Sequence, residues 1–60
     1  MRLLHADGRE VKTGDIVWYG KQSCVFLSFN ESTVNVETTC ERRYFMRVPP
    51  EYLNLTLEVD

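Results

Sequence analysis

The residue types that carry most enzyme chemistry are scarce in this chain, which has one histidine and two cysteines. His5 stands two residues before Asp7, a spacing at which a carboxylate could orient an imidazole as a general base. Cys24 could act as a nucleophile only beside such a base, and it lies in the middle of an apolar, strand-forming run. Because a histidine next to a turn is most often solvated, we expect no catalytic residues and no enzymatic activity.

A metal or cofactor site is not expected either. Structural zinc needs about four ligands, commonly in short paired spacings such as C-x₂-C. Cys24 and Cys40 are sixteen residues apart, and the chain offers only one histidine beside them. Gly8, Gly14 and Gly20 recur every six residues but lie in separate turns, with no following helix whose N–H groups could bind a phosphate.

Length, charge and cysteine content restrict the class of protein. Sixty residues make a single domain spanning residues 1–60, and a chain of this size buries only about 60% of its unfolded surface. Seven Lys and Arg against nine Asp and Glu give a net charge of -2, which argues against non-specific binding to phosphate backbones. With no export signal and no long apolar run, we expect a cytoplasmic protein that avoids membranes and keeps its thiols reduced.

The sequence predicts an all-β chain, because short runs of strand-forming residues alternate with turn residues and no helical periodicity appears. The expected strands span residues 2–5, 16–19, 23–29, 34–37, 43–48 and 53–59. Asp-Gly at 7–8 predicts a tight hairpin, because glycine adopts positive φ freely. Pro-Pro at 49–50 ends a strand and predicts one short 3₁₀ turn before the last strand.

The alternation of side chains along the strands predicts which ones form the core. A three-residue turn at 20–22 would place Trp18 opposite Cys24 and Val17 opposite Val25. The expected inward side chains are Val17, Tyr19, Val25, Leu27, Phe29, Val34, Val36, Tyr44, Met46 and Val48. Their neighbours in sequence then point away from the core.

These elements resemble an SH3-like barrel of the kind found in SH3, Tudor and KOW domains. The resemblance rests on Gly-Asp-Ile-Val at 14–17 and on Val-Pro-Pro-Glu-Tyr-Leu at 48–53. It implies a five-to-six-stranded antiparallel barrel with one 3₁₀ turn. Residues 7–15 are similar to small uncharacterised proteins of bacteria and their phages, which implies no activity. The tyrosine pair and acidic loop with which SH3 domains hold proline-rich peptides have no match here, so that specificity is not implied.

The outward side chains predict a contact surface. The predicted contact face consists of Ile16, Trp18, Phe26, Arg43, Phe45 and Arg47. At ~25 cal/mol per Å² and ~150–250 Å² for each large aromatic side chain, burying its three aromatics would contribute several kcal/mol. Apolar patches edged by arginine are typical of protein contact sites. Alternatively, an N-terminal hairpin carrying Leu3, Leu4 and Val11 covers this same face as a second layer.

Two functions follow from the predicted contact face. The first is a protein-binding module, such as an adaptor, inhibitor or accessory factor of a phage or mobile element. The second is a single-stranded RNA-binding barrel of KOW or Tudor type, in which aromatics stack on bases while arginines and Lys21 meet phosphates. Net charge argues against the second. The alternating leucines of residues 53–59 could also form an edge strand that pairs with a second copy.

Overall fold

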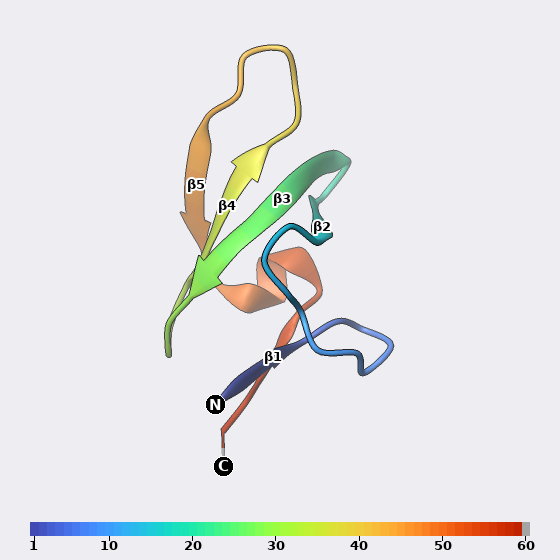
Figure 1. Cartoon of the computed structure of the whole chain (residues 1–60), viewed down its shortest axis with the longest axis vertical. Helices are drawn as coiled ribbons and strands as arrows, with labels where there is room; N and C mark the ends of the chain where they lie inside the picture. The colour runs from blue at the N-terminus through green and yellow to red at the C-terminus, as the bar shows by residue number, and fades with distance from the viewer. Residues whose placement is uncertain (60) are drawn as a thin grey trace.

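The computed structural model describes residues 1–59 as an all-β fold of two antiparallel sheets (Figure 1). The smaller sheet pairs β1 (Arg2–Leu4) with β6 (Thr56–Glu58). The larger sheet is a meander of β2 (Ile16–Tyr19), β3 (Gln22–Phe29), β4 (Val34–Thr38) and β5 (Phe45–Val48). A 3₁₀ turn, η1 (Pro50–Leu53), leads into β6. The prediction of an all-β chain with a 3₁₀ turn before its last strand is confirmed.

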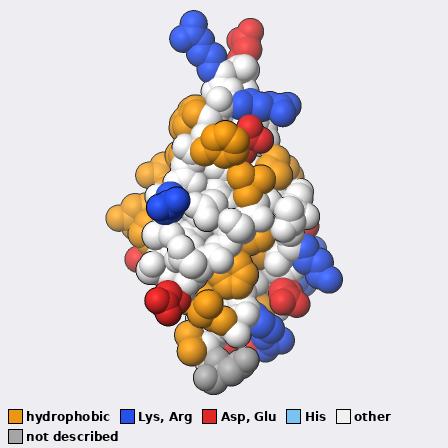
Figure 2. Space-filling model, turned by 60° about the vertical axis from the view of Figure 1, so that its left-hand side comes forward, with side chains coloured by type: hydrophobic (Ala, Val, Ile, Leu, Met, Phe, Trp, Pro, Cys, Tyr) orange, Lys and Arg blue, Asp and Glu red, His pale blue; other side chains and the backbone are white. Residues whose placement is uncertain are grey.

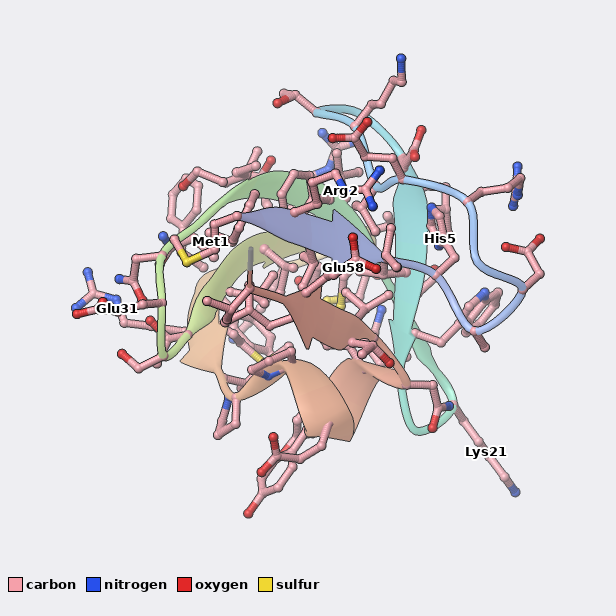
Figure 3. The ribbon with its side chains drawn as sticks, turned by 90° about the horizontal axis from the view of Figure 1, so that it is seen from below. Met1, Arg2, His5, Lys21, Glu31 and Glu58 are labelled. Carbon is pink, nitrogen blue, oxygen red and sulfur yellow. The ribbon has the colours of Figure 1, made fainter. Side chains whose placement is uncertain are left out.

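The predicted closure into a barrel is not confirmed. Among residues 1–59, β1 and β6 pair only with each other, and no strand pairing joins the two sheets. Seen from below, the smaller sheet lies across one end of the molecule, with Arg2 and Glu58 forming an ion pair between its strands (Figure 3). The two sheets are therefore held together by their side chains.

One hydrophobic core joins the two sheets. Its buried members are Leu3, Val11, Val17, Cys24, Phe26, Val34, Val36, Leu53 and Leu55. Phe29, Met46, Val48 and Leu57 are partly buried against it. The inward positions of the two β4 valines are as predicted, whereas Tyr19 and Tyr44, expected in the core, are exposed.

The N-terminal hairpin forms where the sequence predicts it. Leu4 bridges Glu10, and the N–H of Val11 donates to the C=O of Leu3 at 2.8 Å. Gly8 has the positive φ expected of it, +92°. The N–H of His5 donates to the C=O of Arg9 at 2.7 Å, so the loop holds residues 6–8 and not the two-residue Asp-Gly turn that the sequence predicts. Because Leu3 and Val11 belong to the core, this hairpin covers the inner side of the larger sheet and not its outer side.

The register between β2 and β3 differs from the prediction by one residue. Tyr19 pairs with Gln22, so the turn contains only Gly20 and Lys21. Gly20 has φ +62°, as the first central residue of a type II′ turn requires. A shift of one residue moves every side chain of a strand to the other face of the sheet. Val25, expected in the core, therefore lies on the outer side, opposite Ile16.

Phe26 is the member of the predicted contact face that this register removes. It is 3% exposed and lies in the core, where its ring centroid is 6.2 Å from that of Phe29. Both rings point inward because the β3–β4 register shifts between Phe26 and Ser28, which reverses the alternation. Because of this reversal, Phe29 packs against the core as predicted. Leu27 was also expected to point inward, but it is not part of the core.

The end of the chain is more irregular than its alternating leucines suggest. Leu53 belongs to η1, and Asn54 follows it in the left-handed region at φ 56°, so β6 begins only at Thr56. Tyr52 of η1 contacts β2, with its ring centroid 6.3 Å from that of Tyr19. The strand is therefore shorter than the expected 53–59. Leu53 and Leu55, at the start of that range, are buried in the core beside η1.

Candidate functional site

The outer face of the larger sheet carries a row of four side chains, one from each strand. Ile16 is opposite Val25, Val25 is opposite Glu37, and Glu37 is opposite Phe45. Strands in a sheet lie about 4.8 Å apart, so the row spans roughly 14 Å. Ile16 is 49% exposed and Phe45 is 73% exposed. We call the outward-facing residues of this sheet the outer face.

Trp18 and Arg47 extend the row on either side. Trp18 is 52% exposed and follows Ile16 along the same side of β2. Arg47 is opposite Asn35, and its Nε donates to Asn35 Oδ1 at 3.1 Å. The Nδ2 of Asn35 in turn donates to Ser28 Oγ at 3.0 Å. This polar ladder holds the Arg47 guanidinium on the outer face, along β5 from Phe45.

Arg43 does not lie within β5 but in the connection from β4, residues 39–44, which projects beyond the sheet (Figure 1). At its base, the N–H of Thr38 donates to the C=O of Tyr44 at 3.0 Å, and the N–H of Tyr44 donates to Thr38 Oγ1 at 3.2 Å. With the left-hand side of Figure 1 turned forward, hydrophobic side chains are spread along the molecule, and charged side chains lie at its upper end and also at its middle and lower parts (Figure 2).

Four of the six residues of the predicted contact face therefore share the outer face: Ile16, Trp18, Phe45 and Arg47. Arg43 lies beside this face in the projecting connection, and Phe26 lies behind it in the core. The predicted contact face omits Val25 and Glu37, which sit between Ile16 and Phe45. A two-residue turn at Gly20 would have revealed Val25, because it fixes the parity of β3, whereas the predicted alternation of β4 already points Glu37 outward.

A groove of about 360 Å³ runs along the edge of β2. Its lining residues are His5, Ala6, Asp7, Arg9, Ile16, Val17, Trp18, Leu53, Asn54 and Leu55. One wall is therefore β2, and the other consists of the β1–β2 connection together with the end of η1. Trp18 and Ile16 belong both to this groove and to the outer face.

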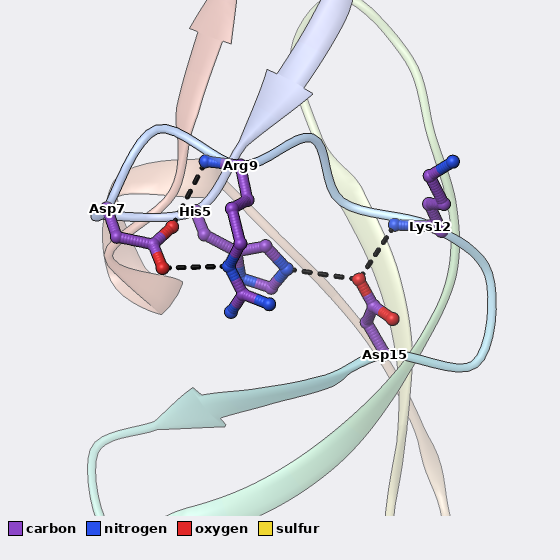
Figure 4. A network of polar contacts seen from close by, with 5 residues as sticks. All are labelled: His5, Asp7, Arg9, Lys12 and Asp15. Carbon is purple, nitrogen blue, oxygen red and sulfur yellow. Dashed lines mark hydrogen bonds and ion pairs between the residues drawn. The ribbon is translucent and has the colours of Figure 1, made fainter.

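Hydrogen bonds fix the wall that faces β2 (Figure 4). His5 Nε2 lies 3.1 Å from Asp15 Oδ2, which also accepts the N–H of Lys12 at 3.0 Å. Asp7 accepts the N–H of Arg9 at 3.0 Å and its Nε at 2.7 Å. His5 thus pairs with Asp15 and not with Asp7, its neighbour in sequence. The pairing ties the β1–β2 connection to the turn that begins β2.

The same contacts explain the acidity of both carboxyl groups. The Lys12 N–H and the His5 ring hold the pKa of Asp15 below its ordinary value of 3.8. The Arg9 N–H and guanidinium lower the pKa of Asp7 in the same way. Both carboxylates are therefore charged at neutral pH, and hydrogen bonds to the charged form stabilise them in the fold.

The groove lacks the partner that a His–Asp pair needs for acyl transfer, since its described lining includes no Ser, Thr or Cys. Cys24 is buried in the core, and burial raises the pKa of its thiol, which keeps it protonated. Cys24 and Cys40 are both free thiols. Within residues 1–59, no three His, Cys, Asp or Glu side chains come close enough to hold a metal ion.

We expect acid to weaken the fold partly through Asp15. A group whose pKa is lower in the folded state stabilises it fully above the unfolded pKa and loses that contribution as pH falls through the folded pKa. The urea midpoint of Asp15→Asn should therefore fall less than that of the wild type between about pH 5 and pH 2. Glu31→Gln, at an exposed position of the β3–β4 turn (Figure 3), should follow the wild-type curve. Identical curves for Asp15→Asn and the wild type would contradict this role of the hydrogen bonds.

Comparison of the chain with protein family models, with curated proteins and with solved structures gave no match. In the part of the chain that the structure describes, no helix has the length and apolar character needed to cross a membrane. The geometry of the outer face and the groove is therefore the basis for assigning a function.

Proposed function

We propose that this chain is a small protein-binding module whose partner contacts the outer face, with Ile16, Trp18 and Phe45 as apolar anchors. The observation that carries the proposal is the exposure of these three large side chains on one side of one sheet. At ~25 cal/mol per Å², covering them would contribute several kcal/mol to an association. Tryptophan and other aromatics flanked by arginine are the usual energetic centres of protein interfaces.

The charges of the outer face suit a protein partner better than a phosphate backbone. Glu37 lies in the row between Val25 and Phe45, and Arg47 lies beside it. A surface that carries charges of both signs can orient a protein partner by electrostatic complementarity, whereas a carboxylate in the middle of the surface repels phosphates. This module carries no catalytic group in our proposal, and its action is to bind.

We further propose that the fold is an SH3-like barrel opened along one seam. A turn with Gly14 at φ +98° leads into β2, the four strands of the meander follow in order, and η1 precedes the last strand. These are the features on which the resemblance to SH3, Tudor and KOW domains rests. In this interpretation the seam is the groove between β2 and the residues that end η1.

Single-stranded RNA binding is the second candidate, and the β4–β5 hairpin favours it. Arg42, Arg43 and Arg47 are exposed there beside two exposed aromatics, Tyr44 and Phe45. Stacking on such aromatics with arginines at the backbone is how sequence-tolerant binders hold single strands. If RNA is the partner, affinity for an oligouridine probe must fall steeply between about 50 and 200 mM salt. Binding that is insensitive to salt would exclude this candidate.

The outer face can be tested by truncating its anchors. Proteins captured by the immobilised wild-type chain are identified and purified, and their affinities for Trp18→Ala and Phe45→Ala are measured by calorimetry. Each substitution should weaken binding by roughly 30-fold, as the loss of an interface hot spot does. Phe45 is mostly exposed and Trp18 is half-buried, so the free energy of unfolding should fall by less than about 1 kcal/mol for Phe45→Ala and by about 1–3 kcal/mol for Trp18→Ala.

Val59→Ala serves as the matched control, because Val59 is an exposed apolar residue beyond the smaller sheet. It should leave affinity and stability unchanged. If a protein binds the wild type and the Trp18→Ala/Phe45→Ala double variant equally well, the outer face is not its binding site. If that is true of every captured protein, the proposal is wrong.

A further inference from the structure

The outer edge of β2 presents backbone groups without strand partners. The N–H of Phe26 donates to the C=O of Asp15 at 2.8 Å, which fixes the phase of the β2–β3 ladder. In an antiparallel pair, alternate residues turn both backbone groups toward the neighbouring strand. Val17, two residues beyond Asp15, therefore turns its backbone N–H and C=O groups toward β3. Ile16 and Trp18 turn their N–H and C=O groups the other way, into the groove.

No other described segment pairs with this edge. β2 is the end strand of the larger sheet, and no backbone hydrogen bond from the rest of residues 1–59 reaches the outer side of Ile16 or Trp18. An open edge is a template for a further strand, and proteins commonly cover or charge such edges. Here the edge carries two large apolar side chains instead of a charge.

We propose that this groove binds an extended peptide segment of a partner protein, which adds to the larger sheet as a fifth strand beside β2. The inference rests on the proposed protein-binding function and specifies the form of the partner. Two N–H and two C=O groups of Ile16 and Trp18 are available to the added strand, and backbone pairing of this kind supplies affinity with little dependence on sequence.

The walls of the groove favour a single extended segment over a second copy of this chain. The side of the groove across from β2 is lined by His5, Arg9 and Asn54, and the groove has a volume of about 360 Å³. A second sheet approaching edge to edge would collide with this wall. The hollow at the other end of the larger sheet differs, since it is lined only by residues of β4 and β5.

The position of the edge also predicts the pattern of the peptide. Side chains of an added strand alternate between the two sides of the sheet. One set lies beside Ile16 and Trp18 on the outer face, and the other set lies on the inner side of the sheet, where Leu53 lines the groove. A bound segment should therefore carry apolar residues at two or three successive alternate positions.

A display library of random octapeptides, selected on the immobilised protein, provides the probe. Enriched peptides should show the alternating apolar pattern. When such a peptide is added, the backbone amides of Ile16 and Trp18 should shift in the NMR spectrum and exchange with solvent more slowly. Methylating the peptide nitrogen that pairs with β2 should weaken binding about tenfold or more, since it removes a hydrogen bond and adds bulk at the edge.

A substitution in the protein tests the same edge from the other side. Ile16→Pro removes an outward N–H, a change tolerated on edge strands, and it also replaces the isoleucine side chain. Ile16→Val keeps that N–H with a similar side chain. The proline variant should lose about tenfold in peptide affinity, and the valine variant should bind like the wild type. If the proline variant does not fold, the methylated peptide tests the same hydrogen bonds on the unaltered protein.

The outcomes separate this inference from the function on which it rests. If no octapeptide is enriched, or if methylated and unmodified peptides bind equally well, strand addition at β2 is wrong. If a captured protein needs Trp18 and Phe45 but leaves the Ile16 amide unshifted, the outer face binds proteins without strand addition. If no captured protein depends on Trp18 or Phe45, while peptides still add to β2, the groove acts without the outer face.

Discussion

The Phe26→Ala variant should be largely unfolded at room temperature. Phe26 is 3% exposed and lies in the core that joins both sheets. Truncating a core phenylalanine to alanine costs about 3–5 kcal/mol, through lost burial and the cavity left behind. A domain of this size has only about 3–5 kcal/mol of stability in total. Circular dichroism and urea titration of the purified variant would measure the loss.

Val25→Ala is the control for Phe26→Ala, because the two residues are neighbours on opposite sides of β3. Val25 is only partly buried, and its truncation should cost about 1 kcal/mol or less. The contrast tests the two-residue turn at Gly20, since the register with a three-residue turn exchanges the two positions. A stable Phe26→Ala protein beside an unfolded Val25→Ala protein would show that the register is the other one.

The second large effect is expected for Leu3→Ala, which should lower the free energy of unfolding by about 2–5 kcal/mol. Leu3 is 1% exposed and is the residue through which β1 enters the shared core. Since no strand pairing links the two sheets within residues 1–59, side chains of this kind hold the smaller sheet in place. Urea unfolding followed by circular dichroism would measure the change.

Hydrogen exchange of the Leu3→Ala protein would show which strands lose stability. The amides of β1 and β6 should lose protection more than those of β3 and β4, because the smaller sheet separates first. Val59→Ala, an exposed change beyond β6, should leave both measurements unaltered. A Leu3→Ala protein with wild-type stability would mean that the sheets are joined by something other than this core.

The strands were predictable from sequence wherever local chemistry determines them. Ile16–Tyr19 is bounded by glycine-containing turns, and it appears with the predicted limits. The β4 valines alternate with polar residues and are buried as expected. The paired prolines at 49–50 place η1, because proline ends a strand and fits the start of a helical turn. These features depend on residues close together in the chain.

What the sequence did not determine is the phase between strands. Gly20-Lys21 and Gly20-Lys21-Gln22 are both acceptable turns, and a difference of one residue exchanges Val25 with Phe26. The bulge after Phe26 then restores the inward position of Phe29. Neither feature has a local signature, because both are settled by how the aromatic rings fill the core between the sheets.

The candidate site was predictable in part for the same reason. The outward positions of Trp18, Phe45 and Arg47 are as predicted, because the side chains of a strand alternate between its two faces. The groove could not be predicted, since its walls come from the β1–β2 connection and the end of η1, which meet only in the folded chain. The pairing of His5 with Asp15 depends on that same tertiary contact.

The connection between β4 and β5 makes the molecule long for its size, with extents of 38 × 20 × 18 Å. Its tip, residues 40–43, stands clear of the core, with only Cys40 partly covered. Loop tips of this kind accept inserted sequence with little loss of stability. A fluorescent reporter or an affinity tag placed between Glu41 and Arg42 would thus leave the edge of β2 unobstructed, and would make this small domain usable as a sensor for whatever it engages.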